Sequence, residues 1–290
     1  GIALTFEMPF VSERHFVFVS KRREDAPVEA LTYEQFTALN DRYEAGEATE
    51  ADLAALEPYR AKRAVLLASG FGSRMMPITI NTPKPLVNVN GTRIIESLLD
   101  ALLAIDVTEI YIVTGYMSEC FEVLKRRYPT ITLLYNPDYA VTNNISSACV
   151  AKEHFQNAYA FESDLYLKNP ALLKKYRYRS CYMGVPVEET PDWCFDTEEG
   201  RIVDLHKGGT DCHHMYGISY WTAEDGAKLA RDLQEEFDSC DETKQRFWDD
   251  VPCVLRRDNY EVFIEDCTFD DIDEIDSLAE LQEIDPRYKM

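Results

Sequence analysis

Short apolar runs alternate with amphipathic stretches through the middle of the chain. The length and aliphatic content of four runs predict buried strands at 64–68, 109–114, 132–135 and 158–162. Helical patterns lie between them at about 93–104, 118–127 and 146–154. Strands that alternate with helices predict an α/β fold with a mostly parallel sheet, helices on its faces and right-handed crossovers.

Both flanks differ from this pattern. Before residue 63, the stretch 6–19 is compatible with a hairpin, and Thr32 and Thr49 are candidate N-caps of two short helices separated by Gly46. We interpret residues 1–62 as a small, partly helical N-terminal appendage that packs on the main domain or on a neighbouring subunit. Its acidity disfavours the alternative of a regulatory or DNA-binding fragment.

Residues 63–290 are interpreted as the main, catalytic domain. After residue 178 the pattern predicts antiparallel strands near 180–187, 201–206 and 216–221, then two helices and a last strand near Val262. The sheet is therefore expected to be mixed.

A glycine- and serine-rich segment follows the first predicted strand. The segment 69–73 offers closely spaced backbone N–H groups that a phosphate can approach, and Arg74 and Lys84 supply positive charge. It lacks the Gly-Lys-Ser/Thr of the Walker pattern and the third glycine of the dinucleotide fingerprint. Because ligands of parallel sheets bind beyond the carboxyl ends of the strands, we expect this loop, Gly115-Tyr116 and Ser163-Asp164 to form one site.

Charge and composition narrow the class of partner. The formal net charge of −22 disfavours nucleic acid and anionic membranes, so positive charge for a phosphate ligand must be local. The sequence has no long uncharged apolar window, and its first residues do not resemble a secretory signal. Eight cysteines without a Cys-x-x-Cys pair fit a reducing compartment, which predicts a cytoplasmic protein.

The run from Ala64 to Gly91 resembles the signature of nucleotidyltransferases. That signature is an apolar strand followed by Ala-Gly-x-Gly-x-Arg and then by Thr-Pro-Lys-Pro. In this chain Ser69 stands in place of the alanine. The resemblance implies a Rossmann-like nucleotidyltransferase fold and catalysis by Arg74, Lys84 and Asp164. It also implies that Mg²⁺ is the cofactor, held by Asp164 and Asp276. The nucleotide-binding residues are then expected to be Ala68, Ser69, Gly70, Phe71, Gly72, Ser73, Gly115, Tyr116, Asn144 and Ser147.

Several later segments, among them Asp192-Trp193 and Phe247-Trp248-Asp249, resemble the bacterial CTP:phosphocholine cytidylyltransferases. CTP and phosphocholine are then the expected substrates, and CDP-choline and pyrophosphate the products. A trimethylammonium group is bound by aromatic faces and carboxylates. The predicted choline site is therefore Trp193, Tyr216, Trp248 and Asp249, whereas Trp221 is assigned to the core.

Three alternatives stay open. The acceptor is a sugar 1-phosphate or phosphoethanolamine instead, or the chain is a non-catalytic nucleotide-sensing module. The resemblance also leaves open a homodimer and a choline kinase-like domain, fused to this chain or acting as its partner.

Overall fold

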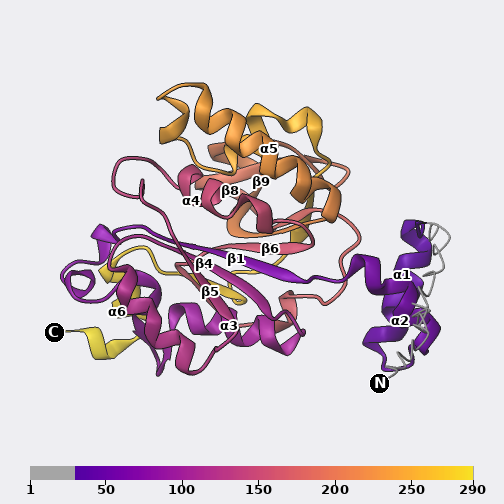
Figure 1. Ribbon diagram of the computed structural model, residues 1–290, viewed down its shortest axis with the longest axis horizontal. Helices are drawn as coiled ribbons and strands as arrows, with labels where there is room; N and C mark the ends of the chain where they lie inside the picture. Colours follow the sequence, from indigo (N-terminus) through magenta and orange to yellow (C-terminus); the bar gives the residue numbers. More distant parts are fainter. Residues whose placement is uncertain (1–29, 290) are drawn as a thin grey trace, which may run out of the picture.

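The computed structural model describes residues 30–289 and centres on a seven-stranded sheet (Figure 1). The strand order is β10-β8-β9-β6-β1-β4-β5. The strands are β1 (Arg63–Ala68), β4 (Glu109–Thr114), β5 (Ile131–Tyr135), β6 (Ala158–Glu162), β8 (Cys181–Glu198), β9 (Arg201–Trp221) and β10 (Phe263–Asp266). β1 is parallel to β4 and β6, β5 is parallel to β4, and β9 is antiparallel to β6 and β8. This mixed sheet confirms the predicted fold class.

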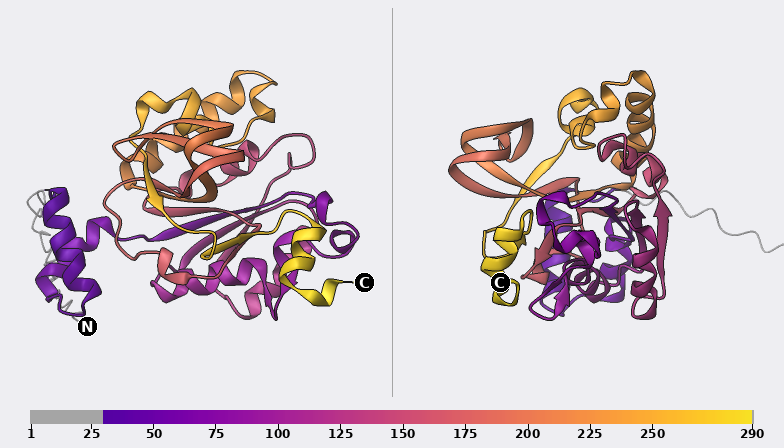
Figure 2. Two further views of the ribbon diagram at one scale, coloured as in Figure 1. Left: turned by 180° about the vertical axis from the view of Figure 1, so that it is seen from behind. Right: turned by 90° about the vertical axis from the view of Figure 1, so that its left-hand side faces the viewer.

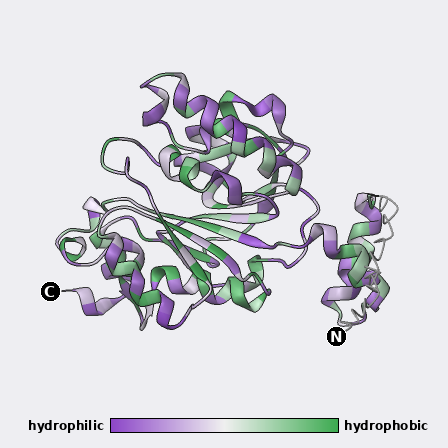
Figure 3. Cartoon of the chain, in the orientation of Figure 1, coloured by the Kyte–Doolittle hydropathy of each residue, from purple (hydrophilic) through white to green (hydrophobic). Residues whose placement is uncertain are grey.

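Strand β1 is buried on both faces, as expected for a central parallel strand. Ala64 and Leu66 belong to one core cluster, which includes Leu98 of α3 (Ile94–Ala104). Val65 and Leu67 belong to a second cluster on the opposite face, beneath α4 (Ile145–Val150) and α5 (Ala223–Ser239). In Figure 3 the parallel strands and α3 are largely hydrophobic, in agreement with this two-sided core.

The crossover after β4 is a 3₁₀ helix, Ser118–Arg126, rather than an α-helix. Phe121 and Leu124 are three residues apart and therefore share one face of such a helix, where both are buried. Shorter 3₁₀ helices connect the other elements at Glu57–Tyr59, Ser73–Met75, Ile78–Ile80, Lys84–Leu86, Lys152–His154, Pro170–Leu172, Thr243–Gln245, Arg257–Asn259 and Pro286–Tyr288, and Val251–Leu255 is a π-helical turn.

The three short antiparallel strands expected after residue 178 are instead two long ones, β8 and β9, joined in one irregular hairpin. Register shifts near Thr190 and Cys194 bend it, which obscures the period-two pattern in the sequence. The hairpin extends from the sheet and curves (Figure 2). Its tip returns to the edge strand, where the Ile202 amide donates to the Val262 carbonyl at 2.8 Å and the Ile264 amide to the Gly200 carbonyl at 2.8 Å.

The C-terminal segment returns to the carboxyl end of β6. β11 (Ile272–Glu274) pairs antiparallel with β7 (Leu165–Leu167), and the Ile275 amide donates to the Asp164 carbonyl at 3.0 Å. Helix α6 (Leu278–Ile284) then packs near the short ribbon of β2 (Asn88–Val89) and β3 (Thr92–Arg93). This path brings residues 164 and 276 together.

At the other end of the chain, α1 (Tyr33–Glu44) and α2 (Glu50–Leu56) lie beside the main domain (Figure 1). The predicted caps Thr32 and Thr49 are confirmed, since each side chain accepts a hydrogen bond from the third helical amide. Phe36 packs with Leu56 and Tyr176. The hairpin predicted at 6–19 lies outside the described residues, and the domain boundary at residue 62 stays a prediction. Within residues 30–289, no helix has the length and apolar character required to cross a membrane.

The contact between α5 and the segment before β6 can be tested at Gly226. A Cβ at this position would collide with the Phe155 carbonyl oxygen and lie 2.6 Å from the Gln156 nitrogen. Alanine is favoured over glycine in a helix by about 1 kcal/mol, but here it forces the two backbones apart. We expect Gly226→Ala to lower the free energy of unfolding by about 1–3 kcal/mol in chemical denaturation. Ala227→Ser, at the exposed neighbour, is the control; a more stable Gly226→Ala would contradict the tight packing.

Candidate active site

The glycine-rich loop after β1 folds back over the segment that carries Lys84. Gly72 adopts a φ of 61°, a left-handed conformation that strongly favours glycine. A Cβ on Gly72 would also lie 2.9 Å from the Lys84 Cβ and 3.1 Å from the Thr79 Cγ2. The glycine therefore permits both the turn and the close approach of the loop to Lys84.

Polar residues behind the loop hold Ser69. The Ser69 and Ser147 hydroxyls are 2.6 Å apart, and the Asn136 amide donates to Ser147 at 3.0 Å. Ser147 is fully buried. The structure therefore corrects its predicted role: Ser147 positions the loop and does not line the cavity.

Gly115 and Tyr116 also support the loop. The Tyr116 amide donates to the Ser69 carbonyl at 3.0 Å, and its phenol donates to the Thr79 carbonyl at 3.0 Å. A Cβ on Gly115 would lie 2.8 Å from that Ser69 oxygen. Neither residue is among those that line the cavity described next, so both support the loop here, and their role as direct nucleotide contacts stays a prediction.

Two adjoining cavities lie at the carboxyl ends of β1 and β6. The first, of about 390 Å³, is lined by the whole loop from Ala68 to Arg74 and by Asn144. The second, of about 350 Å³, lies toward the β8–β9 hairpin. The residues common to both are Arg74, Asn144, Glu162, Asp164, Phe247 and Asp276. We call them the loop cavity and the hairpin cavity.

Charged side chains converge where the cavities meet. The Lys84 ammonium lies 2.9 Å from Asp164 and 2.8 Å from Asp276, and Arg74 lies 2.8 Å from Asp276. Burial alone would lower the pKa of Lys84, but the attraction of the two carboxylates outweighs it and raises that pKa. Burial likewise opposes a low pKa for Asp276, yet Lys84 and Arg74 lower it. The structure thus unites the predicted catalytic and metal-binding side chains.

Glu274 also belongs to this group, and the sequence analysis did not identify it as a site residue. Oxygen atoms of Asp164, Glu274 and Asp276 lie within 4.8 Å of one another, a separation that suits a shared cation. Glu274 keeps an exposed edge, yet its desolvation in the cluster, followed by repulsion from Asp164 and Asp276, raises its pKa to about 8. The available signal was the spacing of residues 274 and 276, because alternate residues of an extended segment point to the same side.

One oxygen of this group has no partner among the described residues. The Oδ1 atom of Asp164 is buried and accepts no hydrogen bond. A buried carboxylate oxygen without a partner is costly unless a donor or cation satisfies it. Asp164, Glu274 and Asp276 therefore fit a hard divalent cation, which prefers oxygen ligands.

The hairpin cavity holds two of the four predicted choline-binding residues, Trp193 and Asp249. The ring of Phe247, another residue that the sequence reasoning missed, meets Trp193 edge-on with 5.5 Å between centroids. Its position directly before Trp248-Asp249 was the available signal.

Tyr216 and Trp248 are instead buried in the core, each 3% exposed. The Tyr216 hydroxyl donates to the Ile272 carbonyl at 3.1 Å, and Trp248 packs on Phe155 and Trp221. Neither presents an open ring face to a ligand. The prediction of an aromatic cage at these two positions is therefore wrong, because packing between helices and sheet uses both rings. Trp221 is buried, as predicted.

Carboxylates line much of the hairpin cavity. Besides the three metal-fitting residues, they are Glu162, Asp192, Asp249 and Asp250. Burial, followed by repulsion from Asp249 and Asp164, raises the pKa of Glu162 well above its usual value. Burial also raises the pKa of Asp249 to about 7, although a hydrogen bond from Tyr182 opposes the shift. The Asn144 amide donates to Glu162 at 2.8 Å. This side of the site therefore favours a positively charged group.

A phosphate-accessible loop, two cations and clustered carboxylates at the carboxyl ends of the parallel strands β1 and β6 fit a site for nucleotidyl transfer. A sequence model of the nucleotidyl transferase family matches residues 63–175. The 2-aminoethylphosphonate cytidylyltransferase of Lancefieldella rimae is 38% identical over 78% of this chain and 92% of its own. The choline-phosphate cytidylyltransferase of Haemophilus influenzae is 30% identical over 76% of this chain and 95% of its own.

Among solved structures, the CTP:phosphocholine cytidylyltransferase of Streptococcus pneumoniae matches with a TM-score of 0.70 and 30% identity, over 79% of this chain and 100% of that one. The chain therefore belongs to the nucleotidyl transferase family, in its cytidylyltransferase branch.

Lys84 offers a test of the carboxylate cluster that does not depend on activity. Lys84→Met removes the cation between Asp164 and Asp276, whose side chains are 24% and 22% exposed. In metal-free buffer we expect a loss of about 1–3 kcal/mol in the free energy of unfolding, less than for a fully buried pair because of this exposure. Magnesium should restore more stability to the variant than it adds to the wild type, because the ion replaces the lost charge.

Lys125→Met is the matched control, since Lys125 pairs with Glu122 on the surface at 2.9 Å. We expect it to change neither stability nor the response to magnesium. An equal magnesium response in Lys84→Met and Lys125→Met would contradict cation binding at this cluster.

Proposed function

We propose that this cytidylyltransferase transfers the cytidylyl group of CTP to a small phosphonate or phosphate ester that ends in a primary ammonium group. The first candidate acceptor is 2-aminoethylphosphonate. The observation that carries the proposal is the wall of the hairpin cavity, where four carboxylates outside the metal-fitting cluster surround only two aromatic rings.

The chemistry of the two ammonium types separates the candidates. A primary ammonium has three N–H donors and is bound by carboxylate oxygens. A trimethylammonium group has no donor and depends on enclosure by aromatic faces. With Tyr216 and Trp248 in the core, Trp193 and Phe247 are the rings that line the cavity, alongside Asp192 and Asp249.

The relatives support the same order of candidates. The protein from Lancefieldella rimae, named for 2-aminoethylphosphonate, is 38% identical to this chain, whereas the choline-phosphate enzymes are about 30% identical. Phosphocholine is the second candidate, favoured by the edge-on pair of Trp193 and Phe247, which offers a partial aromatic enclosure.

In the proposed reaction the acceptor attacks CTP directly. A phosphonate or phosphate oxygen forms a bond to the α-phosphorus, the bond from that phosphorus to the bridging oxygen breaks, and pyrophosphate leaves. A phosphate monoester has a second pKa of about 6 and is largely dianionic at neutral pH, so no general base is required. The loop from Ala68 to Ser73 orients the nucleotide, Arg74 binds the leaving phosphates, and Lys84 stabilises charge near the α-phosphate.

We propose Mg²⁺ as the cofactor, held by Asp164 and Asp276 with Glu274 as a third ligand. The unpartnered Oδ1 atom of Asp164 and the shared separation of the three carboxylates support this assignment. When bound, the ion neutralises negative charge on the phosphate oxygens while pyrophosphate is displaced.

A panel of acceptors tests the proposal. Pyrophosphate release from CTP is measured with 2-aminoethylphosphonate, phosphoethanolamine, phosphocholine and glucose 1-phosphate, with UTP in place of CTP, and with EDTA. We expect CTP and magnesium to be required, and kcat/KM for 2-aminoethylphosphonate to exceed that for phosphocholine by about tenfold, equivalent to one lost ionic hydrogen bond.

A higher kcat/KM for phosphocholine than for 2-aminoethylphosphonate would mean that the site binds a trimethylammonium group rather than a primary ammonium. Activity with the sugar phosphate alone would overturn the role given to the carboxylates. CTP binding without turnover on any acceptor would support a nucleotide-sensing module.

Trp193 and Phe71 form a matched pair for assigning the two cavities. Trp193 lines only the hairpin cavity, and the exposed Phe71 lines only the loop cavity. Loss of one cation–π contact of about 0.5–2 kcal/mol predicts that Trp193→Ala raises the acceptor KM about 2- to 30-fold and leaves the CTP KM unchanged. Phe71→Ala should shift the CTP KM instead. Equal changes in both constants for Trp193→Ala would mean that this ring is structural.

A further inference from the structure

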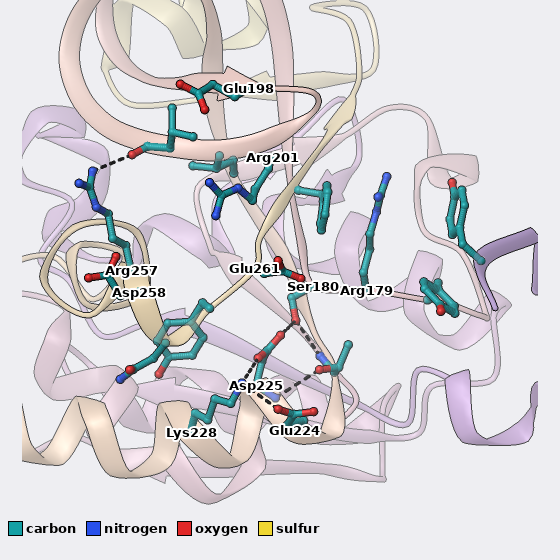
Figure 4. A pocket seen from close by; sticks show the side chains of 18 residues that line it. Arg179, Ser180, Glu198, Arg201, Glu224, Asp225, Lys228, Arg257, Asp258 and Glu261 are labelled. Carbon is teal, nitrogen blue, oxygen red and sulfur yellow. Dashed lines mark hydrogen bonds and ion pairs between the residues drawn. The ribbon is translucent and has the colours of Figure 1, made fainter. Parts of the chain in front are cut away.

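A further cavity, of about 1130 Å³, shares no lining residue with either active-site cavity. Its walls come from the tip of the β8–β9 hairpin, the first turn of α5, the segment before β10, and Tyr33 of α1. Figure 4 shows side chains from these elements facing a common space. Helix α1 thus contributes one residue to this cavity.

Arginines in this cavity are unusual for the chain. Among the described residues, the arginines that form no ion pair are Arg126, Arg179, Arg201 and Arg257. The last three all line this cavity. In a protein with a net charge of −22, three such guanidinium groups around one space offer donors for an oxyanion, in a lining that also carries five carboxylates.

Two of these arginines are held in place by neighbours that leave donors free. The Arg179 guanidinium lies 3.7 Å from the Phe263 ring centroid and 5.0 Å from that of Tyr33. One Arg257 nitrogen donates to the Val203 carbonyl at 2.9 Å. Both contacts orient the guanidinium without neutralising its charge, so the donors are arranged before a ligand arrives.

Carboxylates line the cavity too, and they shape the choice of ligand. Lys228 forms ion pairs with both Glu224 and Asp225, at 2.9 and 3.1 Å, and offsets one of their two negative charges. Glu198, Asp258 and Glu261 also face the space and form no ion pair among the described residues. A ligand that carries an oxyanion together with hydrogen-bond donors would satisfy both sets of groups.

We propose that this cavity is an effector site for a small metabolite with a phosphate, phosphonate or carboxylate group and donor groups of its own. This effector cavity and the hairpin cavity, where the acceptor is proposed to bind, share strand β9. Ile202 and Val203 line the effector cavity, whereas Leu205 and Lys207, further along β9, line the hairpin cavity. An occupant that holds the hairpin tip therefore changes the strand that forms the acceptor wall.

Packed aromatic rings provide a second connection. Tyr260 of the effector cavity lies 6.0 Å from Trp221, which lies 6.0 Å from Trp248, the residue between Phe247 and Asp249 of the hairpin cavity. Both connections end at the acceptor side of the active site. We therefore expect an effector to change the acceptor KM and to leave the CTP KM unchanged.

Titration calorimetry of the full chain in metal-free buffer tests binding, with inorganic phosphate and malonate as probes for the two kinds of oxyanion. We expect Arg201→Gln and Arg257→Gln to weaken binding of the probe about tenfold each, the loss of one charge-assisted hydrogen bond. Arg126→Gln, which removes an equally unpaired arginine outside the cavity, should bind as the wild type does, and so should Lys84→Met in the active site. Binding of malonate alone would assign the cavity to carboxylates, and binding of phosphate alone to phosphoryl groups.

Unchanged affinity in Arg201→Gln, or lost affinity in Lys84→Met, would overturn the site. Kinetics at matched ionic strength then test its role: the probe should shift the acceptor KM of the wild type and not that of Arg201→Gln. A shift of equal size in both would indicate competition in the active site and overturn the effector role. Because calorimetry measures binding without turnover, its outcomes do not depend on the proposed acceptor.

Discussion

The ion pairs of Lys84 with Asp164 and Asp276 join three parts of the chain that are far apart in sequence. Lys84 follows the glycine-rich loop, Asp164 ends β6, and Asp276 follows β11. A group of closely spaced, half-buried carboxylates needs a nearby positive charge, and this lysine provides it. The conformation of Gly72, the pairing of β7 with β11 and the course of the C-terminal segment all serve to bring this cation and its partners together.

The parts of the fold that rest on local chemistry were predictable from the sequence. The apolar run of β1, the caps Thr32 and Thr49, and the loop with Arg74 and Lys84 carry their signals within a few residues. The β8–β9 hairpin was not predictable in its true length, because its register shifts interrupt the alternation. A helical pattern likewise did not distinguish the 3₁₀ crossover from an α-helix.

In the site, the sequence revealed which residue types were present but not which way they face. Trp248 and Phe247 are adjacent and both aromatic, yet one completes the core and the other lines the active site. Only tertiary packing makes that choice. Ser147 illustrates the same limit: it lies one hydrogen bond from the cavity wall, so a correct neighbourhood led to an incorrect contact.

The loop cavity and the hairpin cavity are formed largely by different strands. The loop cavity and the carboxylate cluster depend on β1, β6 and β11, whereas the hairpin cavity, proposed above to bind the acceptor, depends largely on β8, β9 and the segment around Phe247. On the proposed function, substitutions along the hairpin alter which phosphonate or phosphate ester is accepted, while the groups proposed to bind the triphosphate stay fixed. A change of acceptor then requires changes in one hairpin and leaves the catalytic groups in place.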